Sequence, residues 1–436
     1  MFQRKLIAVL GASVLLVVAA GTGHASVARV QAMDLSTPLF SQFTDDYVNI
    51  YSYPTSVVRQ NNLVLAELGE NSGGSVPAST DNRSLTLIKN FPKFGAIAFD
   101  MRQSGQTNFP SNINNQLLDL IWGKAFTKMD LALRFDISNS SIEHSDTSPL
   151  SYEAHGAGFA PSDPYPFGGV FFPGAMTFPG IEMNTWGITP AVAFHMQNDN
   201  RIEGAITFRE YSLDRKINAT DAESWQDAGN LSIGVSIRGV LNHGDRETWY
   251  PAFWYIDDDL GYSVDNLGGV AGLDRSVDES YKSWGVGISN NMKVNDNNLL
   301  LVGIAFSEYK QEYTRTDTNA GGLATDRKTF TSKANLLPSF FASLETQATS
   351  WLTVRMGANK DWSSSEETST DFATPTGSST ENEDLAGFNF TLGTGIKWNN
   401  LDIDMTLNDV FPLTGGWILS GDEATPFTHV SATYHF

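Results

Sequence analysis

The chain has 436 residues, a formal net charge of −21 and no cysteine, and 41% of its residues are hydrophobic. The lack of cysteine excludes disulfides and thiolate metal sites. The strong negative charge excludes nucleic-acid binding as a leading function. If an N-terminal export signal is removed, the rest of the chain is long enough for two soluble domains or for one large barrel.

The N-terminus predicts export. Arg4 and Lys5 precede an apolar run over residues 6–20, and the small-x-small pattern Gly23-His24-Ala25 follows it. The run is about 15 residues long, whereas a transmembrane helix needs ~20. We therefore predict a secretory signal peptide over residues 1–25. A cut after Ala32 is one alternative, and an uncleaved anchor helix is another.

Alternation of apolar and polar residues recurs along the rest of the chain and predicts β-strands. It is clearest over residues 131–137, 231–238, 300–306 and 401–407. Charged side chains on a lipid-facing wall cost roughly 2–4 kcal/mol at the bilayer midplane, so charges within such strands are expected in a wet interior. The predicted lumen charges are Arg134, Asp136, Arg238, Arg355, Asp402 and Asp404.

Strand count and loop rhythm together indicate a membrane barrel. From Phe94 onward the sequence predicts fourteen strands, beginning near residues 94, 116, 129, 185, 200, 230, 247, 280, 299, 330, 350, 384, 401 and 427. Segments 63–68 and 84–90 would add one pair and give sixteen. Short links alternate with long polar segments, as in transmembrane barrels whose long loops are extracellular. The predicted short links are residues 124–128, 197–200, 242–246, 295–298, 346–350 and 399–400, and the predicted long loops are roughly 139–184, 213–229, 257–280, 312–329, 361–383 and 411–426. We expect an all-β, antiparallel transmembrane β-barrel of 14 strands, with 16 as the alternative, over residues 61–436.

The last nine residues resemble the closing strand of bacterial outer-membrane barrels. Over residues 428–436, one face is apolar and the other polar, and the chain ends on an aromatic residue. The resemblance implies that Tyr434 and Phe436 form the signal that the barrel-assembly machinery reads. It also implies location in the bacterial outer membrane, with membrane lipid and lipopolysaccharide as partners.

Residues 33–60 contain the segment Asp45–Thr55, which resembles the N-terminal region of the outer-membrane long-chain fatty-acid and aromatic-hydrocarbon transporters. In that family an Asn-Pro-Ala motif closes a plug, and the matching triplet here is Tyr53-Pro54-Thr55. The pair of segments 118–124 and 129–137 also resembles a paired-strand pattern of the family. The resemblance implies a luminal plug over residues 33–60, with plug residues Asn49, Tyr51, Tyr53 and Pro54.

Physical chemistry gives the same segment a separate interpretation. A tail in water would leave its many apolar and aromatic side chains exposed, which is unfavourable. Docking in the barrel mouth would bury them, and the alternatives are a periplasmic tail or an extra strand.

In the transporter family that this segment resembles, hydrophobic compounds are caught by extracellular loops, pass to an internal pocket and leave sideways through the wall.

The segment 138–184 is the second candidate functional element. Long loops without regular structure are commonly functional or disordered, and disordered segments are poor in aromatic residues. We predict an apolar capture surface for a hydrophobic ligand, formed by Phe167, Phe171, Phe172, Met176 and Phe178. A lid folded onto the barrel rim and a disordered loop remain as alternatives.

Motifs of catalysis are absent from the sequence. No Gly-x-Ser-x-Gly elbow, phosphate-binding glycine loop or His-Glu-x-x-His pair occurs. The sequence therefore predicts no enzyme activity, no cofactor and no metal site. We expect a plugged channel for uptake of hydrophobic small molecules, of the fatty-acid or hydrocarbon class. The alternative is a general diffusion porin for polar solutes, with the lumen charges setting its selectivity.

Overall fold

The structure is a computed structural model of the whole chain. The residues it describes are 26–33, 35, 41–60, 62–70, 81–105, 114–143, 180–215, 224–227, 230–265, 274–318, 324–371, 377–407 and 427–436. The predicted signal peptide (residues 1–25) and the predicted capture surface lie outside the described residues.

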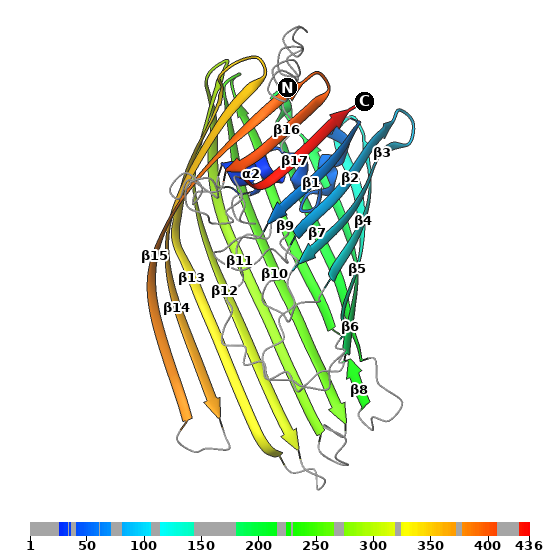
Figure 1. Cartoon of the computed structure of the whole chain (residues 1–436), viewed down its shortest axis with the longest axis vertical. Coiled ribbons are helices and arrows are strands. Elements are labelled where there is room, and N and C mark those ends of the chain that lie inside the picture. Colours follow the sequence, from blue (N-terminus) through cyan, green and yellow to red (C-terminus); the bar gives the residue numbers. More distant parts are fainter. Residues whose placement is uncertain are drawn as a thin grey trace, which may run out of the picture.

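The described strands form a single antiparallel sheet that closes on itself (Figure 1). Each strand pairs with the next along the chain, apart from a short interruption at β8, and β17 pairs with β1. The strands are β1 (Leu63–Glu70), β2 (Asp81–Phe91), β3 (Gly95–Gly105), β4 (Asn114–Ala125), β5 (Met129–Glu143), β6 (Gly180–His195), β7 (Arg201–Arg215), β8 (Ser224–Asp227), β9 (Asn230–His243), β10 (Glu247–Asp265), β11 (Asp274–Asn295), β12 (Asn298–Thr318), β13 (Ala324–Gln347), β14 (Leu352–Asp371), β15 (Gly377–Trp398), β16 (Leu401–Leu407) and β17 (Phe427–His435).

Sixteen of these strands make the closed ring in the described part of the chain, because β7 pairs directly with β9 and β8 only adds to the end of β10. The preferred count of fourteen was too low. The two strands that it omitted are β1 and β2, at the positions proposed for the additional pair. They were harder to see because Leu63, Leu65 and Ile88 point inward and are fully buried, so apolar residues occupy both faces.

Strand lengths differ widely around the ring. β1, β16 and β17 have 8, 7 and 9 residues, whereas β11 to β15 have 20 to 24. The predicted long loops at 257–280, 312–329 and 361–383 are therefore wrong for most of their length, since strand pairing continues into them. These extensions are rich in Ser, Thr and charged residues on both faces, and a strand that is wet on both sides loses the alternation by which it is recognised.

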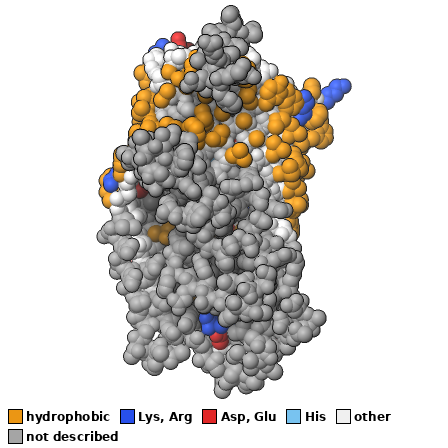
Figure 2. Space-filling view, viewed as in Figure 1, with side chains coloured by type: hydrophobic (Ala, Val, Ile, Leu, Met, Phe, Trp, Pro, Cys, Tyr) orange, Lys and Arg blue, Asp and Glu red, His pale blue; other side chains and the backbone are white. Residues whose placement is uncertain are grey.

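The outward face of the barrel carries an apolar belt. Its exposed side chains include Leu133, Phe135, Trp186, Phe208, Ile237, Phe253, Trp284, Phe306, Phe340, Trp362 and Phe390. Figure 2 shows such side chains gathered towards the end of the molecule with the short turns. On β14, ten residue steps separate Leu352 from Trp362, which at a tilted-strand rise spans about 25 Å, the height of a membrane barrel's apolar band. Beyond the belt, outward positions carry charges such as Lys282 and Asp257, 3.1 Å apart.

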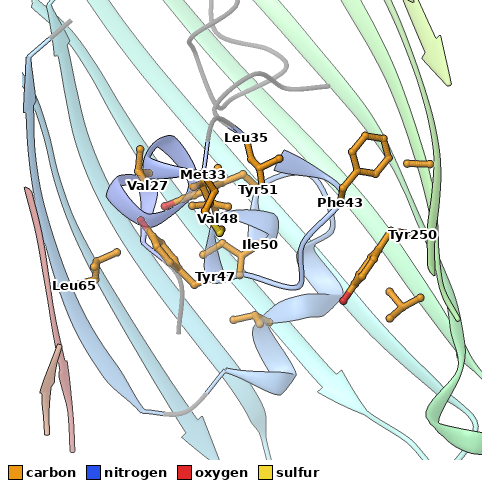
Figure 3. Packing of buried hydrophobic residues seen from close by; sticks show 14 of the residues in the cluster. Val27, Met33, Leu35, Phe43, Tyr47, Val48, Ile50, Tyr51, Leu65 and Tyr250 are labelled. Carbon is orange, nitrogen blue, oxygen red and sulfur yellow. The ribbon is translucent and has the colours of Figure 1, made fainter. Parts of the chain in front are cut away.

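The N-terminal part of the chain lies within the ring of strands (Figures 1 and 3). We call its described residues, 26–33, 35 and 41–60, the inner segment. It contains the helix α2 (Val27–Ala32) and the 3₁₀ helices η1 (Tyr47–Ile50) and η2 (Pro54–Arg59), while a third 3₁₀ helix, η3 (Gln197–Asp199), forms part of a turn. Among the described residues, every helix is too short or too polar to cross a bilayer.

Apolar contacts bury the inner segment against the wall. Its side chains Met33, Leu35, Phe43, Ile50 and Tyr53 are all fully buried. The buried cluster that includes most of them also contains inward residues of the wall, among them Leu63, Leu65, Ile88, Tyr250, Trp254, Leu301 and Phe341 (Figure 3). The segment thus has an apolar core in common with the barrel.

Glycines in the wall make room for one of these contacts. The Phe43 ring stacks on Phe341 with ring centres 5.4 Å apart. It also lies over Gly287, where an added Cβ would come within 2.5 Å of the ring. A side chain in place of that glycine would displace Phe43 and would also press on the Ala305 Cβ and the Ile304 backbone oxygen, each 2.9 Å from the added Cβ.

We expect Gly287→Val to loosen the inner segment, with a destabilisation of about 1–3 kcal/mol, typical of overpacking. Urea unfolding of the refolded protein, followed by protease cleavage within residues 41–60, measures the effect. Gly387→Val is the matched control, because a Cβ at Gly387 meets nothing closer than the Asp361 Cβ at 4.0 Å. Equal protection in both variants would contradict the proposed fit of Phe43 into the wall.

Candidate functional site

The interface between the inner segment and the wall concentrates the buried charges of the described chain. Its ion pairs fall into three groups, each formed by inward side chains of several strands together with residues of the inner segment. An uncompensated charge in such a place costs several kcal/mol, so these groups are expected to be paired.

The first group, which we call the Arg238 cluster, joins β7 and β9 to residues 42–59. Arg238 is fully buried, and its Nε and Nη2 donate to Glu203 Oε1 at 2.9 Å and 2.5 Å. Its Nη1 donates to the backbone oxygens of Gln42 and Thr44 at 3.0 and 2.6 Å. The guanidinium also lies 4.5 Å from the centre of the Tyr53 ring. A single side chain therefore holds three parts of the inner segment.

Two further arginines belong to the Arg238 cluster. Arg59 Nη2 lies 2.8 Å from Glu203 Oε2, and Arg201 Nη2 lies 2.6 Å from Asp45 Oδ2. Burial raises the pKa of Asp45, but the Arg201, Arg59 and Arg238 guanidiniums outweigh it and hold this pKa below its ordinary value. Asp45 is therefore ionised at neutral pH and attracts all three arginines to the inner segment.

The second group, the Tyr51 cluster, lies on β3 to β5. The Tyr51 ring has the Arg102 guanidinium 4.3 Å and the Arg134 guanidinium 5.6 Å from its centre. Arg134 Nη1 donates to the Tyr51 backbone oxygen at 2.9 Å. Both arginines pair with Asp119, and Arg134 Nε lies 2.6 Å from Asp119 Oδ1. Alternating charges across adjacent strands thus surround a single aromatic ring.

The row of charges continues around the wall. Asp136 on β5 accepts from Arg209 Nε on β7 at 3.0 Å, and Ser232 on β9 donates to Asp258 on β10. All four side chains are buried. From β5 to β10, these inward side chains therefore form a charged band.

The third group, the Arg29 cluster, connects α2 with β13, β14 and β16. Arg29 pairs with Asp46 and Glu345, each at 2.6 Å. Arg355 pairs with the same Glu345 at 2.6 Å and with Asp404 at 2.7 Å. Burial raises the pKa of Asp46 more than the neighbouring Arg29 lowers it. The helix is therefore connected to the wall through a chain of shared carboxylates.

Backbone groups of the inner segment also bond to the wall. Besides the arginines described above, wall side chains donate to five more of its carbonyl oxygens: Thr406 to Ala28, Thr391 to Ala32, Ser343 to Met33, Asn291 to Phe43 and Ser236 to Ser52. The donors come from β16, β15, β13, β11 and β9. Backbone outside regular secondary structure can be buried only when its N–H and C=O groups have hydrogen-bond partners such as these.

The predicted lumen charges all have inward positions. Arg134, Asp136 and Arg238 are buried in the Tyr51 cluster, the charged band and the Arg238 cluster, and Arg355 and Asp404 belong to the Arg29 cluster. Asp402 instead lies near the short-turn end, where its Oδ2 is 3.2 Å from His435 Nε2. The structure therefore separates these six residues into five places and does not gather them into one site.

The predicted plug residues stabilise the inner segment itself. Asn49 Nδ2 donates to the Thr44 backbone oxygen at 2.6 Å, and the Tyr53 hydroxyl donates to Gln42 Oε1 at 2.6 Å. Pro54 begins η2, a position where its missing N–H costs nothing. Thr55, the last residue of the matched triplet, lies 3.2 Å from Glu203 Oε2. The triplet is thus directly adjacent to the Arg238 cluster.

The predicted assembly signal lies at the short-turn end of the barrel. Tyr434 and Phe436 are about half exposed on the outer face. Phe436 N donates to the Asn62 backbone oxygen at 3.2 Å, which joins the end of the chain to the start of β1.

Several residues of the interface were not predicted from the sequence. Arg29, Asp45, Asp46, Glu203 and Glu345 all take part in the ion pairs described above. Glu203 and Glu345 could have been recognised by their inward parity on strands whose other residues alternate. The prediction also began the segment at residue 33, whereas α2 is buried with it. No pattern could have identified α2, because its six residues lie beside the predicted cleavage sites.

Acidic and histidine side chains do not form a metal centre within the described ranges, where no group of three or more converges in a suitable arrangement. The carboxylates of the three clusters face arginines instead.

No family model and no curated protein matches the chain. Among solved structures, it is similar to a Pseudomonas aeruginosa FadL homologue, with a TM-score of 0.41 and 10% identity over 95% of this chain and 99% of that one. The copper transporter OprC gives 0.41 and 12%, over 79% of this chain and 44% of that one. The ferric-catecholate import receptor Fiu from E. coli K12 gives 0.35 and 9%, over 86% and 82%. At these scores the likeness carries no argument beyond the barrel that the strand pairing itself shows.

Proposed function

We propose that the protein is a plugged outer-membrane channel that takes up hydrophobic small molecules, and that the inner segment is its plug. The observation that carries the proposal is the anchoring of the inner segment to strands on all sides of the ring, from β1 through β9 to β17. A barrel of sixteen strands is wide enough for an aqueous channel unless something fills it. A buried segment there favours a route for molecules that need no water column.

The apolar belt supports location in a membrane, and the signal peptide supports export to the bacterial outer membrane. Membrane lipid and lipopolysaccharide would surround the belt and the charged surface beyond it. The barrel-assembly machinery would act on the closing strand, whose Tyr434 and Phe436 remain accessible on the outer face. The fatty-acid or hydrocarbon class of substrate comes from the resemblance of residues 45–55 to that transporter family.

The second candidate function is a diffusion porin for polar solutes. The charged band favours it, because opposed rows of Arg and Asp set the transverse field by which porins select solutes. In the structure, however, the charges named above pair with one another or with the inner segment. Paired charges anchor a segment as readily as they select a solute.

Proteoliposomes separate the two functions. For a plugged hydrophobic channel, vesicles holding the refolded protein should not swell in isotonic sugar or amino-acid solutions, and they should transfer a long-chain fatty acid or an aromatic hydrocarbon to an enclosed acceptor. Rapid swelling without any transfer of the hydrophobic probe would establish the porin instead.

We expect Phe171→Ser combined with Phe172→Ser to weaken the affinity for a hydrophobic substrate by about tenfold or more, since burial of two large apolar side chains contributes roughly 1.5–3 kcal/mol each. Equilibrium binding of a labelled fatty acid to the detergent-solubilised protein measures it. The matched control replaces Phe340 by Ser, a change on the lipid-facing belt. Unchanged affinity in the double variant would remove the capture surface from the proposal.

A further inference from the structure

Ser26, the first described residue, is fully buried at the beginning of α2. Its Oγ donates to Asp404 Oδ2 at 2.8 Å, and the next backbone N–H, of Val27, donates to Glu67 Oε1 at 2.7 Å. Two buried carboxylates, on β16 and β1 at either side of β17, thus accept from adjacent residues at the start of α2. Ser26 directly follows Ala25, where the sequence predicts that the signal peptide is cut.

The carboxylates around Ser26 outnumber the cations. The Arg29 cluster contains Asp46, Glu345 and Asp404 against Arg29 and Arg355. Glu67 adds a fourth carboxylate, and within the described chain its partners are neutral, including Ser431 Oγ at 3.1 Å and Ser84 Oγ at 3.3 Å. Four carboxylates therefore face two guanidiniums in a place where an unpaired charge is costly.

We propose that hydrolysis of the Ala25–Ser26 peptide bond after export creates an ammonium group on Ser26 that pairs with Asp404 and Glu67 and completes this buried cluster. The exported-protein signal peptidase supplies the hydrolysis. One water is consumed, the released peptide keeps a carboxylate, and the former amide nitrogen of Ser26 becomes a primary amine that takes up a proton. Processing thus builds a part of the inner segment's anchor. The inference goes beyond the proposed function and does not depend on the substrate.

Covalent geometry places the new charge close enough to act. The Ser26 nitrogen lies within ~3.7 Å of both its own Oγ and the Val27 nitrogen, whatever the side-chain rotamer. Given the 2.8 and 2.7 Å bonds from those atoms, both carboxylates lie within roughly 6.5 Å of the amine, near the range in which an opposite charge favours the charged form. An ammonium also offers three donors where the uncut amide offers one.

The first test is N-terminal sequencing, together with the intact mass, of the protein isolated from outer membranes. We expect a chain that begins at Ser26. A chain that begins at Met33 would lack α2 and would overturn the proposal.

The second test compares refolded protein with a free Ser26 amine and the same protein acetylated at Ser26, a change that removes the charge. Barrel formation is checked in both by circular dichroism. We expect the free amine to react with an amine-selective ester roughly tenfold or more slowly than a peptide of residues 26–33, as a buried group does. Reaction as fast as in the peptide would overturn the proposal even if sequencing places the start at Ser26.

A mutant cycle then assigns the partners. With a free amine, Glu67→Gln should lower the urea midpoint for release of the inner segment, because the ammonium loses a partner. In the acetylated protein, the same change should not lower it, because Glu67 there has no cation. Asp402→Asn is the control, since Asp402 pairs with His435 outside the cluster. An equal effect of Glu67→Gln in both forms would contradict the pairing.

Discussion

Removal of residues 26–60 is expected to turn a nearly silent channel into one with a large, steady current. In planar bilayers the refolded full-length protein should conduct little, and the truncated barrel should conduct roughly tenfold more or beyond, as an unfilled barrel of this size does. The truncation begins at residue 26 because α2 is anchored to the same wall as the rest of the inner segment. The described strands pair with one another through the whole ring without help from this segment, so the barrel itself should persist.

The matched control keeps the length of the chain but removes the contacts of the inner segment with the wall. A Gly/Ser-rich segment of the same length in place of residues 26–60 should be nearly as conductive as the truncation, because it has neither the apolar side chains nor the ion-pairing residues of the inner segment. A large, steady current already present in the full-length protein would contradict the plug and leave the diffusion porin as the function.

Arg238→Met is expected to release the middle of the inner segment without removing it. The change leaves Glu203 with fewer partners and removes the bonds from Arg238 Nη1 to the backbone oxygens of Gln42 and Thr44. Loss of one partner from a buried ion pair costs about 3–5 kcal/mol. Bilayer recordings should then show frequent, brief openings between the closed level and the level of the truncated barrel, and the urea midpoint for release of the segment should fall.

Two further variants define what Arg238 contributes. Arg238→Lys should give an intermediate frequency of openings, because a single ammonium cannot reach Glu203 and both backbone oxygens with the planar fork of a guanidinium. Arg275→Met is the matched control: it breaks a 2.7 Å ion pair with Asp317 that lies far along the long strands, away from the inner segment. Recordings of Arg238→Met that match those of Arg275→Met would show that the Arg238 cluster does not hold the segment closed.

The strands of the barrel wall were easier to predict from the sequence than the contacts of the inner segment, for a physical reason. A strand in lipid must keep its outward residues apolar, so alternation survives over residues 131–137 or 300–306 whatever faces the lumen. The six predicted short links also lie between strands in the structure, because turn residues such as Asn399, with a φ of 55°, are locally determined. The inner segment has no such constraint. Its partners lie tens to hundreds of residues away, and no local pattern encodes the contact of Arg29 with Glu345.

The strand count was too low for a related reason. β1 and β2 face the apolar part of the inner segment, so Leu65 and Ile88 are apolar where other strands have Arg or Asp. Those positions depend on what fills the barrel and not on the bilayer. The count of fourteen therefore missed the pair of strands that the inner segment contacts through apolar side chains.

The unequal strand lengths have a consequence for the shape of the molecule. A strand needs 9–11 residues to cross the bilayer, whereas β13 has 24. The remaining residues, tilted as in other barrels, extend about 30 Å beyond the lipid. One side of the protein therefore stands beyond the apolar belt as an ordered wall that is polar on both faces.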